Sequence, residues 1–204
     1  MHYQLETDSG DHFVLTNAVK LVKDIPGIIC ELGTRRGGSL KTIVEGLLEN
    51  EDINRNVIGV DPYGNINYQS KEDVYSRLDY TNTMRNEAMC ALYDFICYKP
   101  INLVMFHLED VEFFNRFADG VPFYNQEKQV INEYAFVYFD GPHSTDLVLE
   151  EMLFFQPRSP KGAVWVFDDV TGYYPHDEVT EQWLFANGWE LIEKTGQKAS
   201  YKKI

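Results

Sequence analysis

Short apolar segments alternate with helix-like segments along most of this chain, and this alternation constrains the fold more than any other feature. The apolar segments, which have the length and composition of buried strands, are residues 27–33, 56–61, 101–106, 134–140 and 163–167. Strands joined through helices need right-handed crossovers, which place the strands parallel in one sheet with helices on both faces. The pattern therefore predicts a Rossmann-like, doubly wound α/β fold.

The segments between and after these strands agree with that fold. Apolar residues recur at helical spacing in segments 40–48, 84–95 and 148–153, and a further helix is expected near 178–186. Residues 189–203 contain two strand-like segments around a Thr-Gly-Gln turn, which indicates a closing hairpin. We therefore expect a seven-stranded, mostly parallel sheet with a C-terminal antiparallel hairpin.

Composition limits the function. The 204 residues, 44% of them hydrophobic, fit a single domain over residues 1–204. A formal net charge of −14 opposes binding to nucleic acid, because that binding depends on neutralising phosphates with Lys and Arg. Neither a basic, apolar N-terminal leader nor a membrane-length apolar run occurs, and the three cysteines form no Cys-x-x-Cys pair. We expect a cytoplasmic protein that binds no membrane.

The turn after the first strand has the composition of a ligand-binding loop. It reads Glu31-Leu-Gly-Thr-Arg-Arg-Gly-Gly-Ser39, and glycines there let backbone N–H groups and a helix N-terminus approach a ligand. A phosphate-binding P-loop would need a lysine where Ser39 stands, and a dinucleotide loop would need a glycine where Arg35 stands. The second strand ends in Asp61, which can accept hydrogen bonds from a ribose. The combination favours a nucleoside without pyrophosphate, although a plain strand-to-helix connection is the alternative.

Carboxylates also follow two later strands. Asp140-Gly-Pro-His143 ends the fourth strand, and Asp168-Asp169 ends the fifth. Either motif alone is a common turn or helix cap. Because the ends of neighbouring parallel strands meet at one edge of a sheet, we expect the three carboxylates to gather there and to bind a hard divalent cation.

Taken in order, these motifs resemble those of the class I S-adenosylmethionine-dependent methyltransferases. The similarity is closer to the metal-dependent small-molecule O-methyltransferases of the macrocin and mycinamicin type, and more distant to catechol O-methyltransferase. It extends over residues 26–170, and its most specific part is the Asp-Gly-x-His motif together with Asp168-Asp169.

The resemblance implies a role for each matching residue. The cofactor-binding residues that it implies are Glu31, Gly33, Gly37, Ser39, Asp61, Glu109 and Asp110. It further implies that Asp140, Asp168 and Asp169 are ligands of Mg²⁺ or another divalent cation, and that Asp140 and His143 form the catalytic group. His143 would act as general base, and we rank His176 second for that role. Such a site would polarise an acceptor hydroxyl and accept its proton.

Two polar stretches, residues 62–83 and 118–133, are expected to form long loops or lids. Together with residues 171–176, the first is the expected source of the acceptor pocket, in which Tyr63, Tyr68, Tyr173 and Tyr174 either stack on the acceptor or simply pack.

The leading hypothesis is a methyltransferase that uses S-adenosylmethionine and modifies a hydroxyl of a small molecule such as a sugar or phenolic metabolite. A catalytically silent cofactor-binding domain and a sugar-nucleotide or NAD enzyme are the alternatives. We also expect a possible homodimer.

Overall fold

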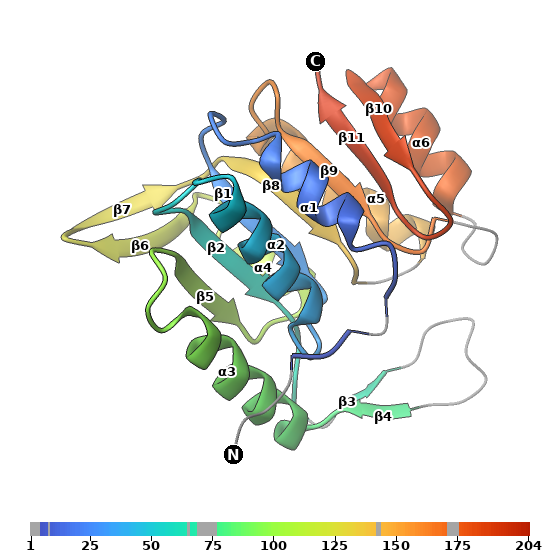
Figure 1. Ribbon diagram of the computed structural model, residues 1–204. Coiled ribbons are helices and arrows are strands. Elements are labelled where there is room, and N and C mark those ends of the chain that lie inside the picture. Colours follow the sequence, from blue (N-terminus) through green and yellow to red (C-terminus); the bar gives the residue numbers. More distant parts are fainter. Residues whose placement is uncertain (1–4, 8, 65, 69–76, 142–143, 171–175) are drawn as a thin grey trace.

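The computed structural model describes residues 5–7, 9–64, 66–68, 77–141, 144–170 and 176–204, and only the backbone of residues 66–68, 77–80 and 176–177. A seven-stranded sheet forms its centre, in the order β10-β11-β9-β8-β1-β2-β5 (Figure 1). The strands are β1 (Ile28–Leu32), β2 (Asn56–Val60), β5 (Asn102–Phe106), β8 (Tyr134–Phe139), β9 (Val164–Phe167), β10 (Trp189–Lys194) and β11 (Ala199–Lys203). β11 is antiparallel to both of its neighbours, and the other pairings within this sheet are parallel. The predicted doubly wound sheet with its closing hairpin is confirmed.

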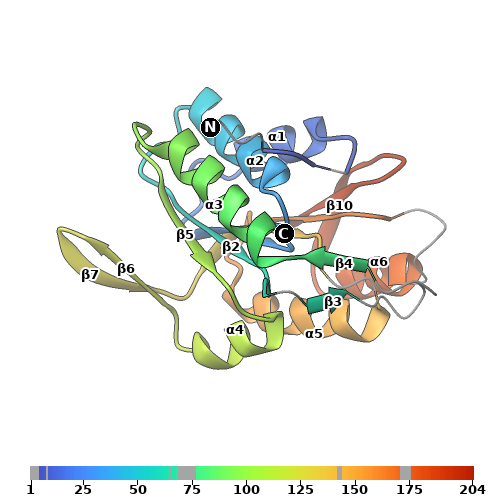
Figure 2. The same cartoon turned by 90° about the horizontal axis from the view of Figure 1, so that it is seen from below.

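Helices cover the two faces of this sheet as separate layers (Figure 2). One layer contains α1 (Phe13–Lys20), α2 (Gly38–Glu49) and α3 (Asn82–Ile96), and the other contains α4 (Asp110–Arg116), α5 (Thr145–Phe155), the short 3₁₀ helix Gln156–Arg158 and α6 (His176–Ala186). Alternate residues of β1 serve the two cores: Ile29 packs with the α1 and α2 layer, whereas Ile28 and Cys30 pack with the α4 and α5 layer. Burial on both faces explains why the strands read as continuous apolar runs.

The order of the strands fixes where a ligand can bind. From β1 the chain winds through β2 to β5, and then returns to place β8 on the other side of β1. In an open α/β sheet, such a reversal marks the crevice beyond the carboxyl ends of the strands in which ligands usually bind, and here it falls between β1 and β8. Gly33 follows β1 there with φ +82, and a Cβ on it would lie 2.0 Å from the carbonyl oxygen of Asp140.

Helix α1 is an element that the sequence analysis did not predict. Its buried residues Val14, Leu15, Ala18 and Val19 form one apolar stripe against α2. Gly46 of α2 allows the close approach, since a Cβ there would lie 2.7 Å from Cγ1 of Val19.

Arg55 anchors the connection between α1 and β1. Its guanidinium donates hydrogen bonds to the carbonyl oxygens of Ile25 (2.8 Å) and Lys23 (2.9 Å), and its Nε lies 2.9 Å from both carboxylate oxygens of Asp52. A planar, five-donor group can satisfy these acceptors together, which an ammonium group cannot.

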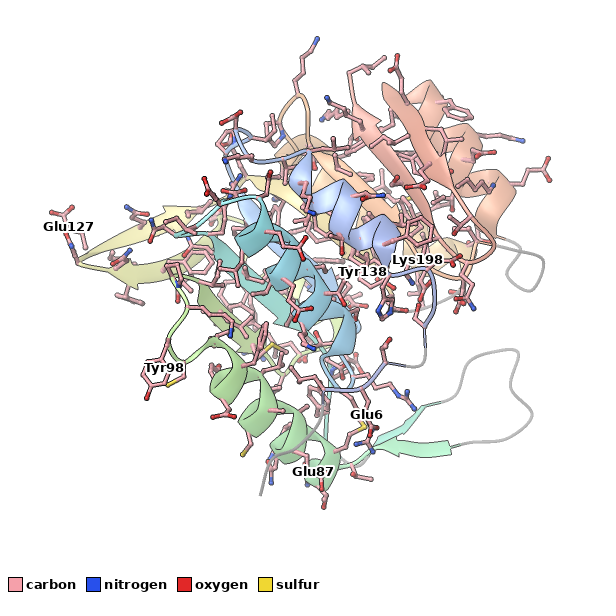
Figure 3. All side chains as sticks on the ribbon, in the orientation of Figure 1. Glu6, Glu87, Tyr98, Glu127, Tyr138 and Lys198 are labelled. Atoms are coloured by element: carbon pink, nitrogen blue, oxygen red, sulfur yellow. The ribbon has the colours of Figure 1, made fainter. Side chains whose placement is uncertain are left out.

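The prediction that residues 118–133 form an irregular loop is wrong. They contain an antiparallel hairpin, β6 (Val121–Asn125) and β7 (Glu127–Ile131), that projects from the body of the protein, with Glu127 at its tip (Figure 3). Residues 62–83 likewise contain the short strands β3 (Ile66–Tyr68) and β4 (Arg77–Tyr80). A lid or acceptor role for either segment stays a prediction. Among the described residues, no helix has the length and apolar character needed to cross a membrane.

Candidate active site

Glu31 is a fully buried acid at the carboxyl end of β1. Neither of its carboxyl oxygens has a hydrogen-bond partner among the described residues. Burial raises its pKa from 4.5 to about 8; the hydroxyls of Ser39 and Thr34 face the group and oppose this rise without bonding it in good geometry. An orphaned buried acid is costly unless a ligand pairs with it.

Asp61, at the end of β2, lies in the same crevice. Its Oδ2 accepts a 2.7 Å hydrogen bond from the backbone N–H of Arg35, whereas its Oδ1 is buried without a partner among the described residues. Burial raises its pKa to about 7, against the effect of the Arg35 hydrogen bond. The free oxygen is suited to accept a hydrogen bond from a ligand hydroxyl, as predicted for the ribose.

The turn that carries these groups has a fixed backbone. Arg35 has φ +44, donates its N–H to Asp61 and accepts a hydrogen bond at its carbonyl from the hydroxyl of Tyr63. Tyr63 is buried and packs edge-on against His107, so that it serves packing rather than acceptor stacking. Gly37 is the N-cap residue of α2 and has φ +78.

The N-terminal segment lies over this turn. The carbonyl of Glu6 accepts a 3.1 Å hydrogen bond from the N–H of Gly38, and the Glu6 side chain lies 3.8 Å from Arg36, which also pairs with Glu87 at 3.6 Å (Figure 3). Arg36 is therefore engaged with the protein surface. Ser39, the second residue of α2, is buried beneath the turn.

A second pair of acids, which the sequence analysis assigned to the cofactor, lies at the start of α4. Glu109 precedes α4 and Asp110 is its first residue, and burial raises the pKa of Asp110 to about 6. Its neighbour is Glu151 of α5, which is 2% exposed and whose pKa is raised well above its usual range by burial and by Asp110. Sequence reasoning missed Glu151, although its place between the buried Val148 and Met152 on an apolar helix face was a signal.

The structure brings together two of the three carboxylates that were predicted to bind metal. Asp140 follows β8 and Asp168 follows β9, and their carboxyl groups lie close enough for each to affect the pKa of the other. Burial and the neighbouring Asp168 raise the pKa of Asp140 well above its usual range. Asp169 follows with φ +51 and is half-buried. His143 lies outside the described residues, as does the side chain of His176, so neither predicted base is tested.

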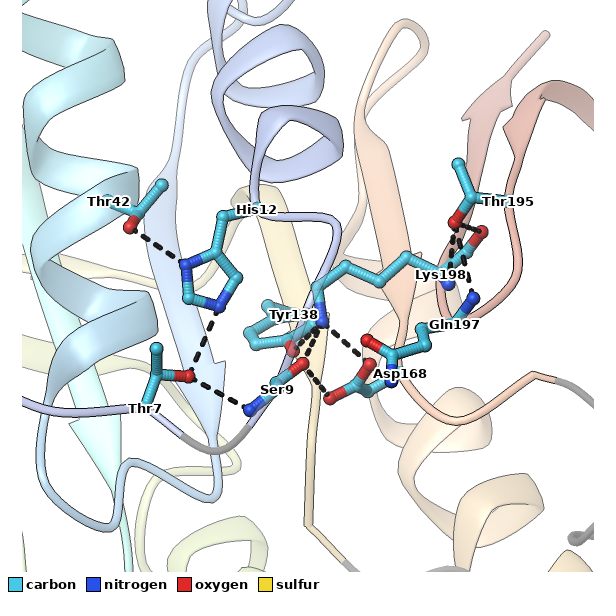
Figure 4. A network of polar contacts seen from close by, with 9 residues as sticks. All are labelled: Thr7, Ser9, His12, Thr42, Tyr138, Asp168, Thr195, Gln197 and Lys198. Atoms are coloured by element: carbon cyan, nitrogen blue, oxygen red, sulfur yellow. Dashed lines mark hydrogen bonds and ion pairs between the residues drawn. The ribbon is translucent and has the colours of Figure 1, made fainter.

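A lysine that the sequence analysis did not single out completes this group. The fully buried Lys198 lies with its Nζ 2.6 Å from Oδ1 of Asp168 and 2.8 Å from the hydroxyl of Tyr138, and it also donates to the hydroxyl of Ser9 (Figures 3 and 4). Ser9 in turn donates a 2.7 Å hydrogen bond to Oδ2 of Asp168. Burial alone would raise the pKa of Asp168, but the Lys198 ammonium group holds it below its usual value.

His12 lies next to this network and bonds Thr7 at 3.1 Å. Burial, followed by the positive charge of Lys198, lowers its pKa. This lowered pKa favours the neutral form of the imidazole over a second positive charge beside Lys198.

The site residues fit a cofactor but do not fit a divalent metal ion. The orphaned oxygens of Glu31 and Asp61 fit a nucleoside ligand with a cationic end. The contacts of Asp168 do not fit a divalent cation, because both of its oxygens are already engaged by Lys198 and Ser9. Within the described part of the chain, no group of three His, Cys, Asp or Glu side chains has the arrangement of a metal site.

Comparison with known proteins identifies the family of the chain. The family described as "Methyltransferase domain" matches residues 30–170. No curated protein matches the sequence significantly.

Several solved structures share the fold. A calicheamicin methyltransferase is similar with a TM-score of 0.66 at 17% identity, over 94% of this chain and 78% of that chain. The O-methyltransferase NovP has a TM-score of 0.61 at 18% identity, with the same 94% and 78% coverage. TomG from Streptomyces achromogenes, an O-methyltransferase of tomaymycin synthesis in complex with SAM, has a TM-score of 0.61 at 12% identity, over 98% and 82%. The chain therefore belongs to the methyltransferase domain family and is a class I S-adenosylmethionine-dependent methyltransferase.

Proposed function

We propose that this methyltransferase transfers the methyl group of S-adenosylmethionine to a hydroxyl of a small molecule such as a sugar or phenolic metabolite. The observation that carries the proposal is the pair of buried acids, Glu31 and Asp61, whose unpaired oxygens lie at the carboxyl ends of β1 and β2 beside the glycine turn. When bound, the cofactor supplies an electrophilic methyl group on a positively charged sulfur. O-methyltransferases among the structures of similar fold support a hydroxyl as the acceptor.

Each residue of the crevice has a proposed task. Asp61 accepts a hydrogen bond from the ribose at Oδ1, while the Arg35 N–H holds its other oxygen in place. Glu31 pairs with the positively charged amino acid end of the cofactor, and Gly33 and Gly37 allow the backbone to approach it. Asp110 lies where the adenine is expected, together with Glu109.

The acceptor side is proposed from the second group of carboxylates. Asp140 stands beyond β8 at the edge that the cofactor crevice shares, so an acceptor hydroxyl there can meet the methyl group in line. We assign the proton-accepting role to His143, three residues after Asp140, and this assignment stays a prediction, as do a homodimer and a requirement for Mg²⁺. The contacts of Asp168 argue against the metal.

Calorimetric titration of S-adenosylmethionine into the wild-type protein tests the cofactor site. We expect micromolar affinity, and a loss of about 10- to 100-fold in Asp61→Asn, because hydrogen bonds to a charged group contribute about 1.5–3 kcal/mol. Asp119→Asn, a change at an exposed aspartate, is the matched control and should bind like wild type. Equal affinity in all three proteins would remove Asp61 from the site.

Methyl transfer to a panel of sugar and phenolic hydroxyl compounds then tests the reaction. A catalytically silent domain would bind the cofactor with the same affinity and transfer no methyl group to any of them. Preferential binding of NAD or a sugar nucleotide in the same titration would instead favour the other enzyme classes.

A further inference from the structure

We propose that the ammonium group of Lys198 takes the place of a divalent metal ion beside Asp168, so that the acceptor site of this methyltransferase is completed by a cation of its own chain. The assignment of this group to an acceptor site rests on the proposed function. Lys198 touches Asp168, Tyr138 and Ser9, and it is a positioning residue for the carboxylates rather than a group that meets the reacting atoms.

The contacts of Asp168 are those of a filled cation site. Oδ1 lies 2.6 Å from Nζ of Lys198, and Oδ2 accepts the 2.7 Å hydrogen bond from Ser9. The side chains of Lys198 and Asp168 are 0% and 4% exposed, so that water does not screen the pair. The lysine therefore meets the carboxylate as a desolvated positive charge.

The pairing of β11 with β9 places this charge next to Asp168. β11 pairs antiparallel with β9, and Ala199 stands opposite Phe167, which brings the preceding Lys198 alongside Asp168. The turn before β11 fixes the lysine backbone: its N–H donates to the hydroxyl of Thr195 at 3.0 Å, and its carbonyl accepts from the same hydroxyl at 3.1 Å (Figure 4). Lys198 is thus held at both its backbone and its ammonium group.

A divalent ion and this ammonium group are mutually exclusive at Asp168. Mg²⁺ binds carboxylate oxygens at about 2.0–2.1 Å with near-ideal octahedral geometry, and it would have to occupy the space that Nζ already fills next to Oδ1. Displacing the lysine would leave a buried ammonium without its carboxylate partner, which is strongly unfavourable.

The ammonium group of Lys198 also makes more hydrogen bonds than a lysine in a surface ion pair usually does. Nζ has three hydrogens, and the structure gives each of them an oxygen acceptor: Asp168, the Tyr138 hydroxyl and the Ser9 hydroxyl. These acceptors come from β8, from the end of β9 and from the N-terminal segment. The ammonium group therefore ties together the parts of the chain that border the acceptor side, as a coordinated metal ion would.

Mn²⁺ binding measured by electron paramagnetic resonance tests this proposal without methyl transfer. The proteins are wild type, Lys198→Met, Lys198→Arg and the matched control Lys202→Met, which changes an exposed lysine of β11. We expect Lys198→Met to bind Mn²⁺ at least about 10-fold more tightly than the other three. Adding Asp168→Asn to Lys198→Met should abolish the gain.

Two results would overturn the proposal. One is micromolar Mn²⁺ binding to the wild-type protein that disappears in Asp168→Asn, since the metal and Lys198 would then coexist. The other is a folded Lys198→Met protein that gains no Mn²⁺ affinity. If circular dichroism shows that Lys198→Met does not fold, the comparison of wild type with Asp168→Asn decides: equal, weak Mn²⁺ binding supports the proposal. Calorimetric binding of S-adenosylmethionine to the same samples separates failure of this proposal from failure of the cofactor site.

Discussion

Replacing Glu31 by Gln is expected to remove a large part of the pH dependence of folding stability. Glu31 is fully buried, and its pKa is about 8 in the folded protein against an ordinary value of 4.5. Between these two values the unfolded chain has released the proton while the folded chain still holds it. The contribution of Glu31 to stability is therefore fully present below pH 4.5 and is lost as the pH rises toward 8.

The size of the effect follows from the same two values. The difference between 4.5 and about 8, at about 1.4 kcal/mol per pH unit, sets an upper limit of about 5 kcal/mol. At about pH 5 the unfolded chain is still partly protonated at Glu31, and at about pH 8 the folded chain is already partly ionised. Between these two pH values the free energy of unfolding therefore changes by about 3 kcal/mol through Glu31. Glutamine has nearly the same shape as glutamate and does not titrate. The free energy of unfolding of Glu31→Gln therefore lacks this part of the dependence on pH.

Urea unfolding followed by circular dichroism, without cofactor, measures the free energy of unfolding at both pH values. Relative to wild type, Glu31→Gln should become more stable by about 3 kcal/mol on going from about pH 5 to about pH 8. Glu190→Gln, at an exposed glutamate of β10, should keep the wild-type slope. If wild type and Glu31→Gln gave parallel profiles, Glu31 would not hold its proton in the folded protein and the reasoning would be refuted.

Three further results are expected. The affinity for S-adenosylmethionine should rise from about pH 6 to about pH 8 as Asp61, with a pKa of about 7, ionises. Calorimetry of Asp61→Asn should show a smaller rise, because only Glu31, with a pKa of about 8, then ionises in this range, and a rise equal to that of wild type would contradict the role of Asp61. Gly33→Ala should lower the free energy of urea unfolding by about 2 kcal/mol or more, because φ is +82 and Cβ would meet the Asp140 carbonyl. Arg55→Lys should lower it by about 2 kcal/mol by leaving carbonyl oxygens unpaired, and unchanged urea midpoints would refute both structural arguments.

The sheet could be predicted from sequence because its strands are buried on both faces. The apolar runs around Cys30, Ile58 and Val137 coincide with β1, β2 and β8 to within one or two residues at each end. Such runs, separated by helical spacing, are compatible with few folds other than a doubly wound sheet. The places of Glu31 and Asp61 at the ends of their strands follow from the same pattern.

The hairpin β6–β7 could not be predicted in this way. Most of its side chains face solvent, including Tyr124 at 74% and Val130 at 56% exposure, and only Val121 and Phe123 at the start of β6 are buried in the core, which is too short an alternation to mark a strand pair. Its strands are defined by their pairing with each other, which a search for core-facing residues does not detect.

Lys198 escaped the sequence analysis for a different reason. In the sequence it lies near Lys194 and Lys202, and nothing distinguishes it from these two lysines, which are of the kind usually found at the surface. In addition, β11 does not alternate cleanly between apolar and polar residues. What makes Lys198 special is its partner Asp168, 30 positions earlier in the chain. A contact of that kind depends on strand register, which one sequence does not specify.

The position of β11 between β9 and β10 has a consequence for the order in which this protein is assembled on the ribosome. β9 and β10 leave the ribosome before the strand that joins them, so the β9 edge and the Asp168 carboxylate emerge without their partners. Until β11 follows, the nascent chain exposes an unpaired strand edge, which is the kind of surface that chaperones protect. Completion of the sheet and pairing of Asp168 with Lys198 therefore depend on the same strand, and a chain interrupted before residue 198 would lack both.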